Sequence, residues 1–268
     1  MKRLTEKYGR AALVAGASEG LGLAFAQRLA REGMDLIMIA RRKDVLEAQA
    51  DAIRKSCNVN VTTVACDLSG ENITGEISSQ TKDAPVDLLV YNAALSYIGP
   101  FLDHPLDAHE RIIAANLSGQ VKLAHHYGSK MAEKGRGAMI FMSSMAGFQG
   151  SGFLTTYSST KAFNRVFAEG LWYEWKRKNI DVLACCAGAI ATPNYVHTNP
   201  KVSGWLRPPL QQPEEVADEC FRRLGKVPSF VSGRGNRLAT FFMHRILSRK
   251  KAVIIMGDQT RKMYGVGD

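Results

Sequence analysis

Short apolar runs alternate with amphipathic stretches along most of this chain. Six nearly unbroken apolar runs predict strands covered on both faces of a parallel sheet, and they span residues 11–16, 35–40, 61–66, 87–92, 138–143 and 181–187. Between the runs, apolar side chains recur at three- and four-residue spacing, which predicts helices over residues 21–31, 43–55, 108–134 and 157–177. Repeated strand–helix–strand units predict the α/β class, with a single doubly wound parallel sheet and helices on both faces.

The later part of the chain has a pattern of its own. No repeat or linker divides the chain before about Thr192, so we expect a single domain over residues 1–268. The segment PEEVADECFRRLG looks like a capped helix, and residues 229–232 are a candidate last strand. Residues 234–268 then mix apolar and basic side chains, which predicts a basic amphipathic helical tail.

Composition narrows the classes of site that the chain can hold. A hydrophobic share of 46% in 268 residues is enough for a sizeable core. The five cysteines form no C-x-x-C pair and the six histidines have no ligand-spaced partners, so we expect no metal site. No signal peptide or membrane-length apolar run is present, and with the cysteine pattern this favours a cytoplasmic protein.

The net charge of +10 is concentrated in the tail. From Arg222 onward eleven basic residues face two acidic ones, which accounts for nine of the ten charges. The tail is open to three interpretations: it covers the substrate cleft or a partner subunit, it lies on an anionic membrane surface, or it binds an acidic carrier or a nucleotide-bearing substrate. Basic charge confined to one tail, without aromatic stacking motifs, argues against nucleic-acid binding.

A glycine-rich turn follows the first predicted strand. The sequence AGASEGLG places Gly16, Gly20 and Gly22 between strand and helix, where glycines let the backbone approach a pyrophosphate at a helix N-terminus. We therefore expect a dinucleotide here, with Ser18 and Leu21 also in contact.

Two arginines follow the second predicted strand. Dinucleotide-binding domains selective for NAD usually carry an acidic residue at this position, and here Arg41 and Arg42 occupy it. A guanidinium pairs well with a 2′-phosphate, so the cofactor expected is NADP(H).

A tyrosine and a lysine begin the helix after the fifth predicted strand. Tyr157 and Lys161 are four residues apart and share one helix face. A nearby cation stabilises a phenolate, so we expect Lys161 and a cationic nicotinamide ring to lower the pKa of Tyr157 from about 10 toward neutrality and to make it an acid and base for a carbonyl or alcohol oxygen. Ser144 is expected to hold the same oxygen; Ser143 is the alternative for this role, but we expect it to be directed toward the strand or the cofactor.

Together these motifs resemble the short-chain dehydrogenase/reductase family, whose fold is Rossmann-like, over the chain up to about Thr192. The resemblance rests on the G-x-x-x-G-x-G turn, CDL at residues 66–68, YNAA at 91–94, AANLSG around Asn116, a serine 13 positions before the tyrosine, Y-x-x-x-K, and AGAIATP at 187–193. Two positions depart from the family pattern: Ala94 replaces a glycine, and Ala187 replaces a proline.

The resemblance implies further roles. Asn116 would bend its helix and position a water in a proton relay with Lys161, and Lys161 would also bind the nicotinamide ribose. The implied cofactor contacts are Asp67 and Leu68 at the adenine, Asn92 and Ala93 behind the fourth strand, and Gly188, Ile190 and Thr192 at the carboxamide. It also implies that the helix over 157–177 forms a face of a homo-oligomer, and that residues 193–212 cover the substrate.

The sequence therefore predicts an NADPH-dependent oxidoreductase that reduces a carbonyl to an alcohol, or runs the reverse reaction, with Tyr157 as general acid and base. Apolar side chains of the covering segment favour a hydrophobic ketone or an acyl-type substrate, and they are Tyr195, Val196, Trp205 and Leu206. The alternative is a non-catalytic NADP(H)-binding sensor or scaffold protein, and the set of Asn116, Ser144, Tyr157 and Lys161 argues against it.

Overall fold

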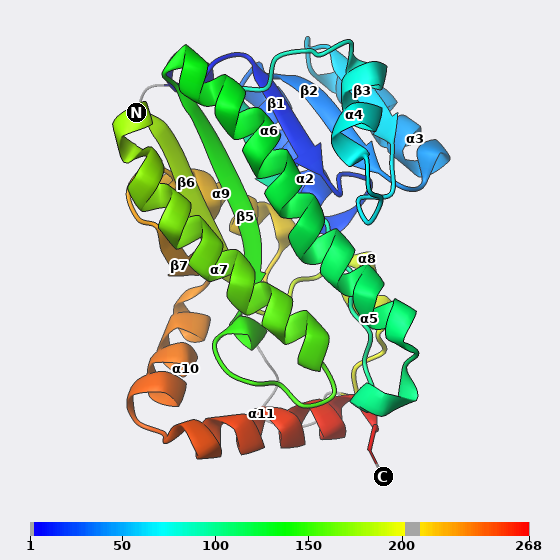
Figure 1. The fold of residues 1–268 in the computed structure, drawn as a ribbon, viewed down its shortest axis with the longest axis vertical. Coiled ribbons are helices and arrows are strands. Elements are labelled where there is room, and N and C mark those ends of the chain that lie inside the picture. The colour runs from blue at the N-terminus through cyan, green and yellow to red at the C-terminus, as the bar shows by residue number, and fades with distance from the viewer. Residues whose placement is uncertain (1–2, 202–209, 268) are drawn as a thin grey trace.

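A parallel sheet of seven strands forms the centre of the computed structural model, which describes residues 3–201 and 210–267 (Figure 1). The strand order is β3-β2-β1-β4-β5-β6-β7. The strands are β1 (Ala11–Ala15), β2 (Asp35–Ala40), β3 (Val61–Ala65), β4 (Leu88–Tyr91), β5 (Gly137–Ser144), β6 (Ile180–Ala187) and β7 (Ser229–Val231). The α/β doubly wound fold is confirmed, and all seven expected strands form within a residue of their predicted ends.

Helices cover both faces of this sheet, which explains why its strands are apolar on both sides. On one face α2 (Gly20–Arg31), α3 (Lys43–Ser56) and α9 (Pro213–Arg223) bury Phe25 and Phe221, whose ring centres are 5.7 Å apart. On the other face α4 (Ile73–Thr81) packs against β3, α6 (Gly119–Lys134) against β5, and α7 (Thr155–Trp175) against β5 and β6. Strand order reverses between β1 and β4, and such a reversal leaves a crevice at the carboxyl ends of the strands.

The single helix predicted over residues 108–134 is interrupted. It consists of α5 (Leu106–Ile113), a π-helical turn over Ala114–Ser118 and α6. The Tyr91 hydroxyl donates to the Ala115 carbonyl, and a Cβ at Gly119 would lie 2.5 Å from that hydroxyl. The wider turn fits the helix against the end of β4, and periodicity alone did not show this contact.

Three short or weakly patterned helices were not predicted. They are α1 (Leu4–Lys7), α4 and α8 (Pro193–His197). In α4 only Ile73, Ile77 and Thr81 are buried, so its apolar stripe is short. Helix α8 starts the segment expected to cover the substrate, of which Trp205 and Leu206 lie outside the described residues.

The basic tail folds into two helices, α10 (Arg234–Arg245) and α11 (Arg249–Tyr264). Helix α11 crosses the lower end of the molecule, below α7 and α5 (Figure 1). It is anchored by Arg249, whose Nη1 donates to the Phe148 carbonyl at 2.7 Å, and by Met263, whose carbonyl accepts from the Lys201 amide at 2.7 Å. Helix α10 leaves part of its apolar stripe exposed, namely Leu238, Phe241, Phe242 and Ile246. In the described part of the chain no helix is long and apolar enough to cross a membrane.

Candidate active site

A cavity of about 580 Å³ opens at the crevice beyond the carboxyl ends of the strands. Of the residues proposed from sequence for catalysis and cofactor binding, all except Gly22 and Asn116 line it. Those lining residues are Gly16, Ser18, Gly20, Leu21, Arg41, Arg42, Asp67, Leu68, Asn92, Ala93, Ser144, Tyr157, Lys161, Gly188, Ile190 and Thr192. The fold thus brings together, in one cleft, residues that lie more than 170 positions apart in the sequence.

The glycine-rich turn has the shape that the sequence requires. Gly16 has a φ of +81°, and a Cβ there would lie 2.8 Å from the Ala93 Cα. A Cβ at Gly22 would lie 1.8 Å from the Gly16 carbonyl oxygen, so Gly22 lets α2 pack on β1 instead of lining the cleft. The Asn92 side chain donates to the same carbonyl at 3.1 Å. The turn is therefore held in place by Asn92, which follows β4, and the N-terminus of α2 faces the cavity.

The two arginines line the cavity directly after β2. Arg42 Nη2 is 2.6 Å from Glu19 Oε2, in an ion pair that joins the two turns following β1 and β2. Asp67 follows β3 beside them. Burial opposes its ionisation, but hydrogen bonds from Ser69 and the charges of Arg41 and Arg111 together lower the pKa of Asp67.

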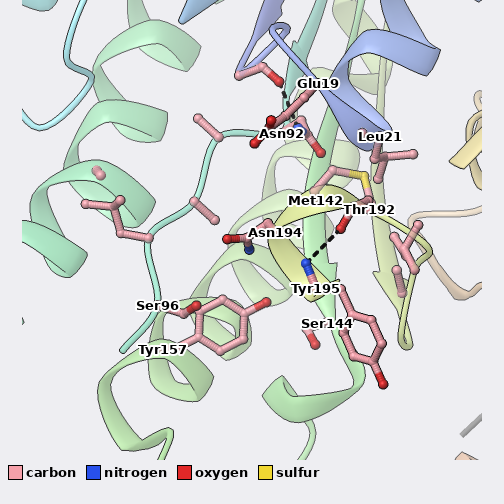
Figure 2. Close-up of a pocket in the computed structure, with 18 of the residues that line it drawn as sticks. Glu19, Leu21, Asn92, Ser96, Met142, Ser144, Tyr157, Thr192, Asn194 and Tyr195 are labelled. Carbon is pink, nitrogen blue, oxygen red and sulfur yellow. Dashed lines mark hydrogen bonds between the residues drawn. The ribbon is translucent and has the colours of Figure 1, made fainter. Parts of the chain in front are cut away.

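Tyr157 and Lys161 come from the first two turns of α7, and Ser144 ends β5. Figure 2 shows Tyr157 and Ser144 at the cavity together with Ser96 and Asn194. The Lys161 ammonium lies 5.5 Å from the centre of the Tyr157 ring. The Ser144 hydroxyl also accepts from the Ala146 amide at 3.2 Å, which orients it at the start of the loop after β5.

Backbone contacts hold Lys161 against β5. Its Nζ donates to the Met142 carbonyl at 2.9 Å, and its own carbonyl accepts from the Ser143 hydroxyl at 2.7 Å. Ser143 therefore ties α7 to the strand, and it also lines the cavity, so its role as the alternative to Ser144 stays a prediction.

Burial dominates the effect of the chain's own groups on the pKa of Tyr157. Burial raises it above the usual value for a tyrosine, while a hydrogen bond with Ser144 lowers it and the nearby Tyr264 raises it. Burial also lowers the pKa of Lys161 to about 8. Among the chain's own groups, desolvation outweighs the effect of the ammonium, which is hydrogen-bonded to the Met142 carbonyl; the lowering expected from Lys161 together with a cationic nicotinamide ring stays a prediction. The phenol is thus a proton donor at neutral pH.

Asn116 lies in the π-helical turn, behind the cavity. Its Oδ1 accepts from the Leu95 amide at 2.7 Å, and its Nδ2 donates to the Leu95 carbonyl at 2.9 Å and to the Thr160 hydroxyl at 3.1 Å. The side chain thus ties the loop after β4 to α7 beside Lys161. The relay through a water, implied by the family resemblance, stays a prediction.

Several residues that line the cavity were not proposed from sequence, among them Glu19 and Tyr264. Glu19 lies within the glycine-rich motif at a position that the motif leaves variable. Tyr264 comes from the end of α11, and only the docking of the tail brings it to Tyr157. No group of three or more metal-ligating side chains was found among the described residues.

Known proteins similar to this chain share one type of chemistry. The family described as short chain dehydrogenase matches residues 10–203. A 7beta-hydroxysteroid dehydrogenase of Mediterraneibacter gnavus is 34% identical over 236 residues, which are 87% of this chain and 90% of that relative. A solved structure from work on 7beta-hydroxysteroid dehydrogenase stereoselectivity is 30% identical, with a TM-score of 0.89 over 95% of this chain and 99% of that chain. A short-chain dehydrogenase from Sphingobium yanoikuyae in complex with NADPH is 27% identical, with a TM-score of 0.73 over 83% of this chain and 86% of that chain.

Proposed function

We propose that this chain, which belongs to the short-chain dehydrogenase/reductase family, reduces the carbonyl group of a bulky hydrophobic substrate with NADPH, Tyr157 donating the proton. Membership of the family makes it an oxidoreductase. The observation that carries the finer proposal is one cleft with the Arg41–Arg42 pair at one end and Ser144, Tyr157 and Lys161 at the other.

The residues present fit a phosphorylated dinucleotide. The cradle at Gly16 and Gly20, which a Cβ would fill, suits a pyrophosphate, and the arginines after β2 suit a 2′-phosphate. The S. yanoikuyae neighbour, which was solved with NADPH, supports the same choice. When bound, NADPH supplies the hydride for the reaction; Lys161, Ile190 and Thr192 line the same cleft and would hold its nicotinamide end.

The chain's own residues donate the proton and stabilise the charge that is left behind. Because burial keeps Tyr157 protonated, its hydroxyl can hydrogen-bond to a carbonyl oxygen and give up its proton as that oxygen gains charge. Ser144 can donate a second hydrogen bond to the same oxygen. Lys161, with a pKa of about 8, is mostly cationic at pH 7 and stabilises the phenolate left behind. The same groups serve the reverse oxidation, in which the deprotonated tyrosine accepts the proton of the alcohol.

Apolar and aromatic side chains line part of the cleft, namely Ile98, Leu154, Ile190, Tyr195 and Tyr264, beside polar ones such as Ser96 and Asn194. Such walls exclude water and contact a rigid apolar body better than a small polar one. The hydroxysteroid dehydrogenases among the relatives support a polycyclic ketone as the substrate class.

A panel of ketones tests this proposal. Polycyclic ketones, long-chain 3-oxoacyl thioesters and small polar ketones are each incubated with the protein and NADPH or NADH, and absorbance of the reduced nicotinamide is followed. We expect the highest kcat/KM for a polycyclic ketone with NADPH. Faster turnover of small polar ketones contradicts the substrate proposal. No turnover with any carbonyl favours a non-catalytic sensor or scaffold.

Assembly and location stay predictions. Val166 and Tyr173 are exposed on α7, the helix expected to face a second copy, and light scattering of the purified protein tests a homo-oligomer. Sedimentation with anionic liposomes tests the membrane contact predicted for the tail. Cytoplasmic location is likewise an expectation.

A further inference from the structure

Glu19 lies where a 2′-phosphate would have to approach the protein. It immediately precedes α2, adopts extended backbone angles and makes no side-chain hydrogen bond that caps this helix. Its carboxylate instead reaches the turn after β2 and pairs with Arg42 at 2.6 Å. Both residues line the cleft.

This ion pair occupies the arginine assigned to the cofactor. The side chains of Arg42 and Glu19 are 56% and 38% exposed, so the pair is accessible from solvent and can exchange partners. A phosphate that takes Arg42 as its partner either displaces the Glu19 carboxylate or stays next to it. Both outcomes cost free energy, because the first breaks an ion pair and the second brings two anions together.

This free-energy cost applies to NADPH and not to NADH. NADH carries hydroxyl groups at the corresponding ribose and has no second anion to place beside Glu19. A carboxylate can accept hydrogen bonds from ribose hydroxyls, as the acidic residue after the second strand does in proteins selective for NAD. In this chain that residue is absent and Arg41 and Arg42 stand there, but Glu19 supplies a carboxylate from the opposite turn.

We propose that Glu19 is a cofactor-specificity residue: its carboxylate competes with the 2′-phosphate for Arg42 and so weakens the preference for NADPH over NADH that the arginines create. This inference rests on the proposed function, because it concerns the same cleft. Glu19 acts on the affinity for the adenosine end of the cofactor and leaves the proton donation by Tyr157 unaffected.

Direct binding measurements test the role of Glu19. Glu19→Gln keeps the size of the side chain and removes its charge. Since an exposed ion pair and a nearby like charge are each worth about 1 kcal/mol or less, we expect the Kd for NADPH to fall about fivefold. The Kd for 2′,5′-ADP should fall by the same factor, whereas the Kd values for NADH and 5′-AMP should not decrease. Calorimetry on the full chain gives these values without turnover.

A matched control separates this effect from net charge. Glu133→Gln makes the same charge change at an exposed position on α6, next to Lys134, which pairs with Asp87 just before β4 and therefore lies away from the cleft. This variant should bind all four ligands as the wild type does. Glu19→Ala, as a second substitution, should repeat the gain for NADPH, and thermal melting verifies that each variant is folded.

The outcomes are distinct. An unchanged or higher Kd for NADPH in both folded Glu19 variants overturns the inference and makes Glu19 a residue that orients Arg42. An equal gain for NADH and NADPH also overturns it, because the effect is then not specific to the 2′-phosphate. Failure of the wild type to bind either dinucleotide overturns the proposed function itself.

Discussion

The ammonium of Lys161 lies 5.5 Å from the centre of the Tyr157 ring and donates its hydrogen bond to the carbonyl of Met142. The lysine is thus held by β5 and lies beside the tyrosine ring as a cation. On the proposed function we expect Lys161 to contribute through its charge, while the proton relay implied with Asn116 stays a prediction.

The pH dependence of activity should report that charge. Burial lowers the pKa of Lys161 to about 8 and raises the pKa of Tyr157, so the lysine loses its proton first as pH rises. We expect kcat/KM for carbonyl reduction to be constant near pH 7 and to fall above about pH 8. In Lys161→Arg, which keeps its charge, the decline should begin at higher pH even if the maximal rate is lower. An unchanged midpoint in this variant assigns the decline to another group.

The same shift predicts how stability depends on pH. The pKa of Lys161 is about 8 in the folded protein and 10.5 for an ordinary lysine, so between these values the unfolded state binds more protons. The contribution of Lys161 to the free energy of unfolding should therefore rise with pH across this window. Urea unfolding at pH 7.5 and 9.5 measures it, and Lys161→Met should show a smaller rise than the wild type.

The glycine-rich turn gives a prediction on stability. Because a Cβ at Gly22 would lie 1.8 Å from the Gly16 carbonyl oxygen, Gly22→Ala should destabilise the fold by about 3 kcal/mol. Gly170, also helical, has nothing within 4 Å of the same position, so Gly170→Ala is the control and should stabilise by about 0.5 kcal/mol. Denaturant unfolding compares the two, and equal effects contradict the packing argument.

Asn116 should matter for stability as well as for catalysis. Asn116→Ala leaves the amide and carbonyl of Leu95 without their side-chain partner, which we expect to cost about 3 kcal/mol of unfolding free energy. Asn58→Ala, at an exposed position, should change stability by less than about 0.5 kcal/mol. If Asn116→Ala is as stable as the wild type but inactive, the role of Asn116 lies in proton transfer and not in holding the fold.

The tail should select for substrate size. Tyr264 lines the cavity from the end of α11, so Tyr264→Ala should raise KM for polycyclic ketones about fivefold through the loss of an aromatic contact. A small ketone does not extend to that wall, and its KM should change less than twofold. Tyr173→Ala, at a side chain 78% exposed on α7, is the control. Equal changes for both substrates contradict a role in size selection.

Local sequence patterns predicted much of the fold and many of the residues that line the cleft. Uninterrupted apolar runs gave the strands, and residues such as Arg41 and Ser144 follow directly from where those strands end. The π-helical turn depends on Tyr91, Leu95 and Leu68, which are distant in sequence from Asn116 and Gly119. The position of Tyr264 depends on how α11 packs against the rest of the protein. The pKa of Tyr157 depends on its burial, which the residues of its own helix do not indicate.

Replacing the hydroxyl of Tyr157 tests the central claim most directly. Tyr157→Phe keeps the ring and removes the proton donor, and Tyr173→Phe removes a hydroxyl from the same helix outside the cleft. We expect kcat/KM for ketone reduction to fall by about 100-fold or more in Tyr157→Phe, with the Kd for NADPH within twofold of wild type, and no change in Tyr173→Phe. Ketone-dependent NADPH oxidation at the wild-type rate in Tyr157→Phe would contradict the account.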